Sequence, residues 1–272
     1  TIIFMKPITD LVKKALPLPL KTTLKRLIYA YNSEGFQPYI KKKNIEGLSF
    51  DFWIGDVVGR NWYDLNSIEP DWPEMRFIKD EMLVEGDVVL ECGTHHGCAT
   101  ILFSKWVGET GQVIAFEPFP KNCEIIAKNI EINGIKNVSI QAKAVGLEKG
   151  KIRIDGVSNS SIVTNNQGIE VDVINLDEYQ DLKPTFIKID VEGFEQQVLQ
   201  GAMKILASKP KLAIELHTEV LELYGASVEK IIDLIGIDRY NFWVQLDDRE
   251  YPVAYDTKSP IKKRAHLFCL PK

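Results

Sequence analysis

From about residue 86 onward, short apolar runs alternate with segments of helical character, and this alternation limits the possible folds more than any other feature of the chain. Buried strands and the helices that connect them follow each other in this way in a parallel sheet with right-handed crossovers. The last two runs are joined without a helix, which favours an antiparallel edge. We expect seven strands, at residues 88–92, 113–116, 138–140, 186–189, 211–216, 242–246 and 266–270.

The segments between these strands predict the helices. Pro120 opens one of them, and proline is tolerated in a first turn because its missing N–H would have no partner there. Two further extended runs, at residues 151–154 and 169–174, alternate like a hairpin or flap. Helices are expected at residues 98–106, 120–129, 194–207 and 228–235. The sequence therefore predicts an α/β fold, doubly wound around a mostly parallel seven-stranded sheet in the Rossmann-like manner.

The first 84 residues differ in character, so we place an N-terminal extension at 1–84 and the main domain at 85–272. Short helices are expected at residues 11–16 and 22–31, on either side of a proline-containing break. Residues 1–43 carry nine Lys or Arg and two acids, a net charge of +7, which leaves −12 for the rest of the chain. Such a basic arm could contact a phosphate-bearing partner, an acidic carrier protein or a membrane surface. The alternative is a solvated helical arm packed on the core or on a second subunit, and a homodimer through this arm is one possibility.

The rest of the extension suggests a lid. Residues 41–44 are polar and are predicted to form a link, and residues 45–58 alternate loosely, as a hairpin or an irregular lid does. Aromatic side chains gather in this region, which favours either a substrate pocket or packing on the main core. They are Trp53, Trp62, Tyr63 and Trp72.

Composition bounds the setting of the protein. No run of eighteen apolar residues is present, as a transmembrane helix would need, and the start lacks the pattern of a secretory signal. The four cysteines form no Cys-x-x-Cys pair, which is typical of reduced thiols and of a cytoplasmic protein. The net charge of −5 argues against a general nucleic-acid binder.

The sequence ECGTHHG follows the first core strand directly and precedes a helix. Gly93 and Gly97 allow the backbone to approach a ligand closely, and the helix N-terminus offers free N–H groups. In open α/β sheets a ligand lies beyond the carboxyl ends of the strands. The spacing is not Gly-x-Gly-x-x-Gly, which disfavours a dinucleotide.

Polar groups also follow the next core strands. Glu117 lies at the end of the second strand, where an acid can accept both ribose hydroxyls of a nucleoside, although a helix-capping carboxylate is the alternative. Asp190 and Glu192 follow the fourth strand, and His217 follows the fifth. Core strands have no structural need for such residues, so their convergence on one sheet edge predicts a site.

The succession ECGTHHG, FEP, KIDVEGFE and IELH resembles the FkbM family of methyltransferases over residues 86–217. The resemblance implies a class I methyltransferase fold and S-adenosylmethionine as methyl donor, with S-adenosylhomocysteine as product. It also implies O-methylation of a sugar, a polyketide or a similar metabolite.

Transferred by position, the family's cofactor contacts fall on residues of these four segments and on two residues past the third strand. They are Glu91, Gly93, Thr94, His95 and Gly97 for the methionine and ribose part, Glu117 and Pro118 for the ribose, Lys143 and Ala144 near the adenine, and Asp190 near the sulfonium. The turn departs from the family's usual Gly-Ala-Asn. His95 and His96 stand in it instead, which leaves its geometry open.

For a hydroxyl acceptor a general base helps, since an alcohol is a poor nucleophile. His217 is the first choice, with Asp190 or Glu192 orienting it or taking the proton directly. A strand-end histidine satisfied by local backbone is the alternative. Together with Glu215, these groups could hold a divalent metal instead, but we do not favour a metal. Zinc at Cys92, His95, His96 and Cys98 is disfavoured because Cys92 falls inside a strand.

Three other functions compete with this hypothesis. A methyltransferase acting on nucleic acid or protein is disfavoured because no Asn/Asp-Pro-Pro-aromatic motif follows the fourth strand. A catalytically silent scaffold would not need Glu117 and Asp190. A nicotinamide oxidoreductase would need the missing glycine pattern.

Overall fold

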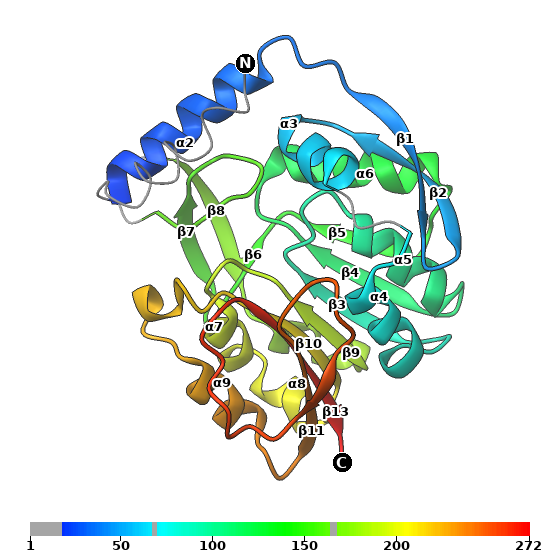
Figure 1. The fold of residues 1–272 in the computed structure, drawn as a ribbon, viewed down its shortest axis with the longest axis vertical. Coiled ribbons are helices and arrows are strands. Elements are labelled where there is room, and N and C mark those ends of the chain that lie inside the picture. Colours follow the sequence, from blue (N-terminus) through cyan, green and yellow to red (C-terminus); the bar gives the residue numbers. More distant parts are fainter. Residues whose placement is uncertain (1–17, 67–69, 164–167) are drawn as a thin grey trace.

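The computed structural model of the chain describes residues 18–66, 70–163 and 168–272. Its centre is a sheet in the order β12-β11-β13-β10-β9-β3-β4-β5 (Figure 1). The core strands from β5 to β10 in this order run parallel, whereas β13 is antiparallel to both β10 and β11. All seven predicted strands are present, and β12 adds an eighth at the edge. They are β3 (Val88–Cys92), β4 (Gln112–Phe116), β5 (Val138–Gln141), β9 (Phe186–Ile189), β10 (Lys211–Leu216), β11 (Tyr240–Gln245), β12 (Val253–Tyr255) and β13 (Ala265–Pro271).

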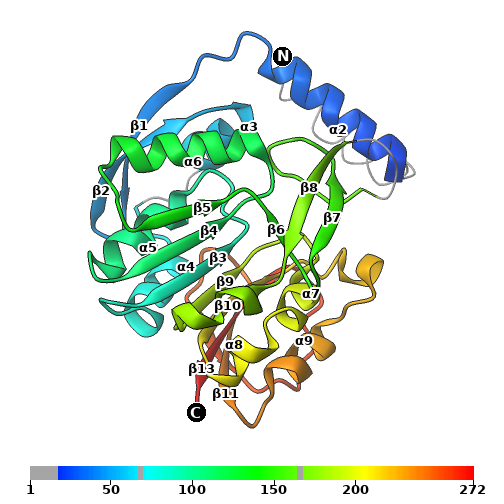
Figure 2. The same cartoon turned by 180° about the vertical axis from the view of Figure 1, so that it is seen from behind.

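Helices cover both faces of this sheet, as the doubly wound prediction requires. Leu90 belongs to the apolar cluster that includes side chains of α7, α8 and α9, whereas its neighbour Val89 belongs to the cluster of α4 and α5. Successive strand residues point to opposite faces, which explains the division. Helix α6 contacts both β5 and the N-terminal strand β2 (Figure 2). The helices are α4 (Pro73–Phe77), α5 (Cys98–Val107), α6 (Pro120–Ile132), α7 (Glu195–Gln200), α8 (Met203–Ala207) and α9 (Val228–Ile235).

The single helix predicted over residues 194–207 is wrong, because the chain forms α7 and α8 there. Between them, Gly201 packs so closely on Gly146 that a Cβ would lie 2.1 Å from the Gly146 carbonyl oxygen. The close backbone approach interrupts the helix. Short turns of 3-10 helix connect other elements, η3 (Leu176–Leu182) and η4 (Leu221–Tyr224).

A small second sheet stands beside the main one in the order β6-β8-β7. It consists of β6 (Ala144–Val145), β7 (Gly150–Ile154) and β8 (Ile169–Ile174). Strands β7 and β8 pair antiparallel, as the predicted flap requires. Apolar residues of its three strands form a cluster of their own with Phe119.

The N-terminal part begins with α2 (Leu18–Ser33), which starts before the helix predicted at residues 22–31. The helix predicted at residues 11–16 lies outside the described residues. The predicted hairpin is β1 (Tyr39–Ile45) and β2 (Leu48–Ile54). Residues 41–44 are therefore strand, and the predicted link is wrong there. Lys43 points inward and is buried. Strands are recognised from alternating polar and apolar residues, and three lysines in a row conceal that alternation.

The hairpin and the segments after it share a core with the main sheet. Phe52 and Met75 lie in the same buried cluster as Val89 and Ile101. The segments are α3 (Val57–Arg60), η1 (Asn61–Leu65) and η2 (Ile78–Met82), in addition to α4. The division of the chain after residue 84 stays a prediction. None of the described helices has both the length and the apolar character to cross a bilayer.

Candidate active site

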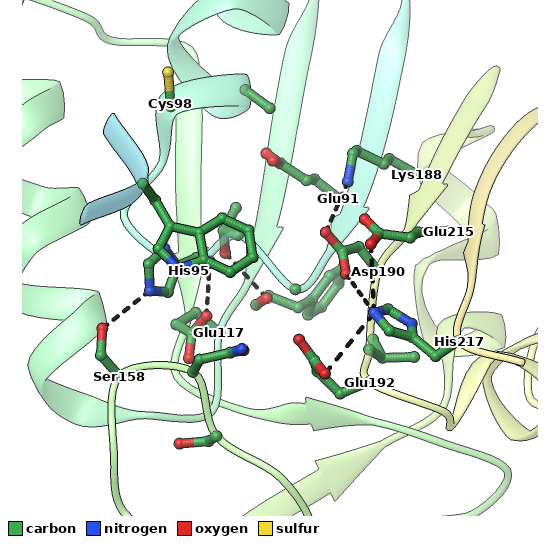
Figure 3. Close-up of a pocket in the computed structure, with 18 of the residues that line it drawn as sticks. Glu91, His95, Cys98, Glu117, Ser158, Lys188, Asp190, Glu192, Glu215 and His217 are labelled. Atoms are coloured by element: carbon green, nitrogen blue, oxygen red, sulfur yellow. Dashed lines mark hydrogen bonds and ion pairs between the residues drawn. The ribbon is translucent and has the colours of Figure 1, made fainter. Parts of the chain in front are cut away.

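A cavity of about 460 Å³ opens where β3, β4, β9 and β10 end (Figure 3). This is the edge at which α/β sheets of this kind place their ligands. All predicted site residues except Gly97 line it: Glu91, Gly93, Thr94, His95, Glu117, Pro118, Lys143, Ala144, Asp190, Glu192 and His217. Gly97 instead caps the N-terminus of α5 with φ +81°.

The turn after β3 depends on Gly93. Its N–H donates to the Phe116 carbonyl at 3.0 Å, and its φ is +86°. A Cβ at this position would lie 1.7 Å from the Asp190 carbonyl oxygen. Only glycine lets the turn lie this close to the segment after β9. The same approach brings the predicted cofactor turn next to Asp190.

His95 links this turn to the other walls of the cavity. Its backbone N–H donates to Glu117 Oε2 at 2.9 Å, and its ring contacts Tyr63 Oη at 2.8 Å and Ser158 Oγ at 3.0 Å. The ring stacks on His96 with centroids 4.0 Å apart, and His96 Nε2 also lies 3.0 Å from Ser158 Oγ. Burial, followed by the neighbouring His96, holds the pKa of His95 well below its ordinary value. His95 is therefore a neutral ring at physiological pH.

Two buried carboxyl groups border the turn. Glu117 accepts hydrogen bonds from the backbone N–H groups of His95 and Phe119, both at 2.9 Å, and burial raises its pKa to about 7. Glu91 accepts from Thr100 Oγ1 at 2.7 Å, and burial raises its pKa to about 8. Backbone and hydroxyl donors thus fix both carboxyl groups at the cavity edge.

A polar cluster lies across the cavity from His95 and Glu117 (Figure 3). His217 Nδ1 is 2.7 Å from Glu195 Oε1, which also accepts from the Gly193 N–H at 2.9 Å. Since that oxygen accepts, Nδ1 is the donor and Nε2 is the ring atom that faces the cluster. Three carboxyl oxygens surround Nε2 at longer distances: Asp190 Oδ1 at 3.9 Å, Glu192 Oε2 at 3.8 Å and Glu215 Oε1 at 3.4 Å.

The charges of this cluster are strongly coupled. Burial alone would lower the pKa of His217, but the hydrogen bond to Glu195 and the nearby Asp190 raise it to about 9. Burial would raise the pKa of Asp190, but the Lys188 ammonium, 3.3 Å away, and His217 lower it to about 2. Burial and the charge of Asp190 raise the pKa of Glu215 to about 7. Asp190 is therefore the permanent anion of the cluster.

A sequence profile of the methyltransferase FkbM domain matches residues 91–242, more than half of the chain. The chain belongs to the FkbM methyltransferase family. It is an S-adenosylmethionine-dependent methyltransferase, as the resemblance of the four segments implied. A search of curated proteins finds no match.

Several solved structures are similar to this FkbM-family chain at low sequence identity. A methyltransferase FkbM from Methylobacillus flagellatus KT is 20% identical with a TM-score of 0.49, over 72% of this chain and 48% of the other. The chain thus spans about half the length of that protein. A SAM-dependent O-methyltransferase from Thermotoga maritima is 12% identical with a TM-score of 0.46, over 85% and 77%. An rRNA methylase from Streptococcus thermophilus is 16% identical with a TM-score of 0.45, over 73% and 93%.

The cavity of this FkbM-family chain suits an adenosyl cofactor. The closely packed Gly93 leaves room beside Asp190, and Glu117 presents a fixed carboxyl group that can accept hydrogen bonds from hydroxyl groups. The small second sheet and its adjoining loop add an apolar wall suited to the flat face of a purine. That wall consists of Ala144, Val145, Ile152, Ile154 and Ile162.

The sequence missed several polar residues that line the cavity or hold its lining residues in place. Glu195 was read only as part of the KIDVEGFE segment, but it fixes the ring of His217. Ser158 lies between the two runs of the predicted flap, and it contacts both stacked histidines. Four more polar residues line the cavity but come from segments without a recognisable sequence motif, so the sequence around them does not indicate a site. They are Glu74, Gln245, Arg264 and His266.

The geometry also bears on metals. Asp190, Glu192 and His217 offer ligand atoms within 4.8 Å of one another, and in the described part of the chain no other group of three or more His, Cys or acid side chains could hold a metal. Cys92 and Cys98 do not join such a group. The Lys188 ammonium lies beside Asp190, and His217 carries a second positive charge when its ring is protonated, which its raised pKa favours. These two groups already balance the carboxylates, so we assign no metal to this cluster.

Proposed function

We propose that this methyltransferase transfers the methyl group of S-adenosylmethionine to a hydroxyl group of a small or medium-sized metabolite. The observation that carries the proposal is the orientation of His217. Glu195 occupies Nδ1, so Nε2 faces the cavity beside Asp190, next to the turn that suits the cofactor. A hydroxyl acceptor needs such a base, because an alcohol is a poor nucleophile.

When bound, S-adenosylmethionine supplies a methyl group already activated by the sulfonium and leaves as S-adenosylhomocysteine. We assign Glu117 and Pro118 to the ribose, Lys143 and Ala144 to the adenine side, and Gly93 to the methionine part. Thr94 and His95 belong to the same turn and complete this wall. Asp190 lies at the reacting end, where a carboxylate also complements a cationic sulfonium.

The proposed reaction assigns two tasks to the chain's own residues. They hold the acceptor oxygen in line with the methyl group, and His217 Nε2 takes the hydroxyl proton as the new oxygen–carbon bond forms. Glu192, the most exposed carboxylate around Nε2, then passes that proton to solvent, while Asp190 stays ionised and stabilises the imidazolium. Glu195 keeps Nε2 directed at the acceptor throughout.

The test begins with calorimetric titration of S-adenosylmethionine and S-adenosylhomocysteine into the wild-type protein and Glu117→Ala. We expect binding by the wild type and a loss of at least about tenfold in affinity in the variant, because a buried acceptor of ribose hydroxyls is removed. Glu222→Ala, on η4, is the matched control. Absence of binding to folded wild-type protein would overturn the proposal.

The acceptor class is tested with methyl-labelled S-adenosylmethionine and a cell extract separated into small molecules, nucleic acid and protein. We expect the label in small molecules as an alkali-stable ether. Label in RNA or protein would favour the macromolecular alternative, and donor binding without transfer to any fraction would favour a silent scaffold. The cytoplasmic setting, the homodimer and the boundary after residue 84 remain further expectations.

A further inference from the structure

Helix α2 carries a stripe of large apolar side chains that the rest of the chain leaves exposed. Leu24, Leu27, Ile28 and Tyr31 have the spacing i, i+3, i+4 and i+7, which places them along one face of a helix. Leu27 is 64% exposed, Ile28 37% and Tyr31 78%. Among the described residues, these three side chains join no apolar cluster. The stripe therefore faces solvent.

The other side of α2 is held against the rest of the chain through Tyr29. Its hydroxyl group donates to Asp56 Oδ2 at 2.9 Å, and the Lys121 ammonium lies 3.3 Å from the hydroxyl oxygen and 5.6 Å from the ring centre. At 3.6 residues per turn, Tyr29 points away from the line that joins Leu27 and Tyr31. Figures 1 and 2 draw α2 along one edge of the molecule. The contact with Asp56 thus fixes the helix with its apolar stripe turned outward.

The charge of the chain is divided between this N-terminal arm and the remainder. Residues 1–33 carry six Lys or Arg and one acid, a net charge of +5, which leaves −10 for residues 34–272 because the whole chain has −5. Helix α2 itself contains three Lys or Arg and no Asp or Glu. A negatively charged surface would attract the arm and repel the remainder. Charge therefore directs the arm, with its apolar stripe, toward such a surface.

An anionic lipid surface matches both features of the arm, whereas other partners match only one. Nucleic acid would pair with the cations but leave the aliphatic Leu27 and Ile28 in water. A second copy of α2 would cover the stripe but bring the cations of two arms together. Lipid offers hydrocarbon to the stripe and charged headgroups to the cations at the same time. Tyr31 suits the boundary between them, since its ring is apolar and its hydroxyl group is polar.

We propose that α2 is an interfacial helix that docks the enzyme on the surface of an anionic lipid bilayer. The helix lies along the surface and does not cross the bilayer. Leu27, Ile28 and Tyr31 enter the level between the headgroups and the acyl chains, and the cations of residues 1–33 pair with the anionic headgroups. This contact is independent of the proposed function, because neither the cofactor nor an acceptor takes part in it.

The test measures binding of the full chain to lipid vesicles by sedimentation. The probes are vesicles of phosphatidylcholine alone and vesicles that also contain about 30% phosphatidylserine. We expect the wild-type chain to bind the anionic vesicles at least about tenfold more tightly than the neutral ones. Most of this difference should be lost in about 1 M salt, because salt screens the charge of the lipid surface.

The variant Leu27→Gln/Tyr31→Gln removes the apolar surface but keeps the charge of the arm and a good helix former at both positions. It should bind the anionic vesicles about tenfold or more weakly than wild type. Leu223→Gln/Tyr251→Gln is the matched control, because these side chains are 65% and 45% exposed in other parts of the surface. It should bind within about twofold of wild type. Circular dichroism checks that both variants are folded.

A wild-type chain that stays off the anionic vesicles overturns the assignment. So does a Leu27→Gln/Tyr31→Gln variant that binds them as tightly as wild type, or an equal loss in both double variants. Light scattering tests the other occupant: a wild-type dimer that becomes a monomer in Leu27→Gln/Tyr31→Gln, without vesicle binding, would assign the stripe to a second copy. These measurements use no S-adenosylmethionine, so failure of the proposed function would leave the lipid contact standing, and the reverse also holds.

Discussion

The Nδ1 atom of His217 lies 2.7 Å from Oε1 of Glu195, a carboxyl group buried to 0% exposure. The contact joins the end of β10 to the first residue of α7. The Gly193 N–H fixes the same oxygen, so the histidine ring is oriented from behind by a rigid segment. A carboxylate behind an imidazole sets both its tautomer and its basicity, and this leaves Nε2 to the cavity.

Replacement of Glu195 with Gln should therefore lower the pKa of His217 from about 9 toward its ordinary value and mix its two tautomers. The negative charge that stabilises the imidazolium is removed while the size of the side chain is kept. The chain has four histidines, so nitrogen NMR of labelled histidine resolves His217 readily. Measured at about pH 10, where His217 is mostly unprotonated in both proteins, kcat for methyl transfer should fall about 10- to 100-fold because the ring is no longer oriented, with little change in KM for the donor.

Glu222→Gln, on η4, is the control for that experiment and should leave the His217 signals unchanged. The NMR readout needs no acceptor, so it separates the orientation of His217 from the identity of the substrate. An unchanged pKa and a single unchanged tautomer in Glu195→Gln would show that Glu195 does not orient the ring.

The rate of methyl transfer should rise with pH up to about 9. His217 acts as a base only when Nε2 is unprotonated, and its pKa is raised to about 9, so the active fraction increases as pH rises through that value. Below it, kcat should increase about tenfold per pH unit. The profile is measured with the acceptor found by labelling. A rate that does not change between pH 6 and pH 9 would exclude His217 as the base.

The parts of the site that follow parallel strands could be predicted from the sequence, and the parts on antiparallel strands could not. Glu91, Asp190 and His217 each follow a buried apolar run directly, and parallel strands end at one edge, so their convergence follows from the order of elements. Gln245 and His266 come together only through the register of β11 with β13. That register depends on pairing between segments distant in sequence, which no local pattern records.

Contacts that depend on tertiary packing were hidden in the same way. Glu195 follows a glycine turn and looks like an ordinary acid in the first turn of a helix. Its partner, His217, lies twenty-two residues away in the sequence. Lys43 stands in a run of three lysines, and only the pairing of β1 with β2 turns its side chain inward.

Gly93→Ala should abolish binding of S-adenosylhomocysteine and destabilise the fold. A Cβ at this position would lie 1.7 Å from the Asp190 carbonyl oxygen, and the backbone has φ +86°. The turn must therefore move away from β9, at a cost of about 2 to 4 kcal/mol in the free energy of unfolding. Denaturant unfolding and calorimetry measure the two effects.

Gly134→Ala is the matched control for this change. Gly134 also has a positive φ, +64°, but no atom lies within 4 Å of the Cβ position. It should cost about 1 kcal/mol, from the backbone conformation alone. It should leave cofactor affinity unchanged. Equal effects of the two substitutions would mean that the close approach of Gly93 to Asp190 is not needed.

Removal of metal ions should leave methyl transfer unchanged. Asp190, Glu192 and His217 have a spacing that a divalent ion could use, so the point needs a direct test. However, the Lys188 ammonium lies 3.3 Å from Asp190 Oδ2, and His217 with its raised pKa adds a second positive charge. A metal would have to compete with both, and the proton transfer assigned to Nε2 requires that this nitrogen be free.

After dialysis against EDTA, the rate should stay within about twofold of the untreated enzyme. A loss of activity that Mg²⁺, Mn²⁺ or Zn²⁺ restores would instead make the cluster a metal site and remove His217 as the base.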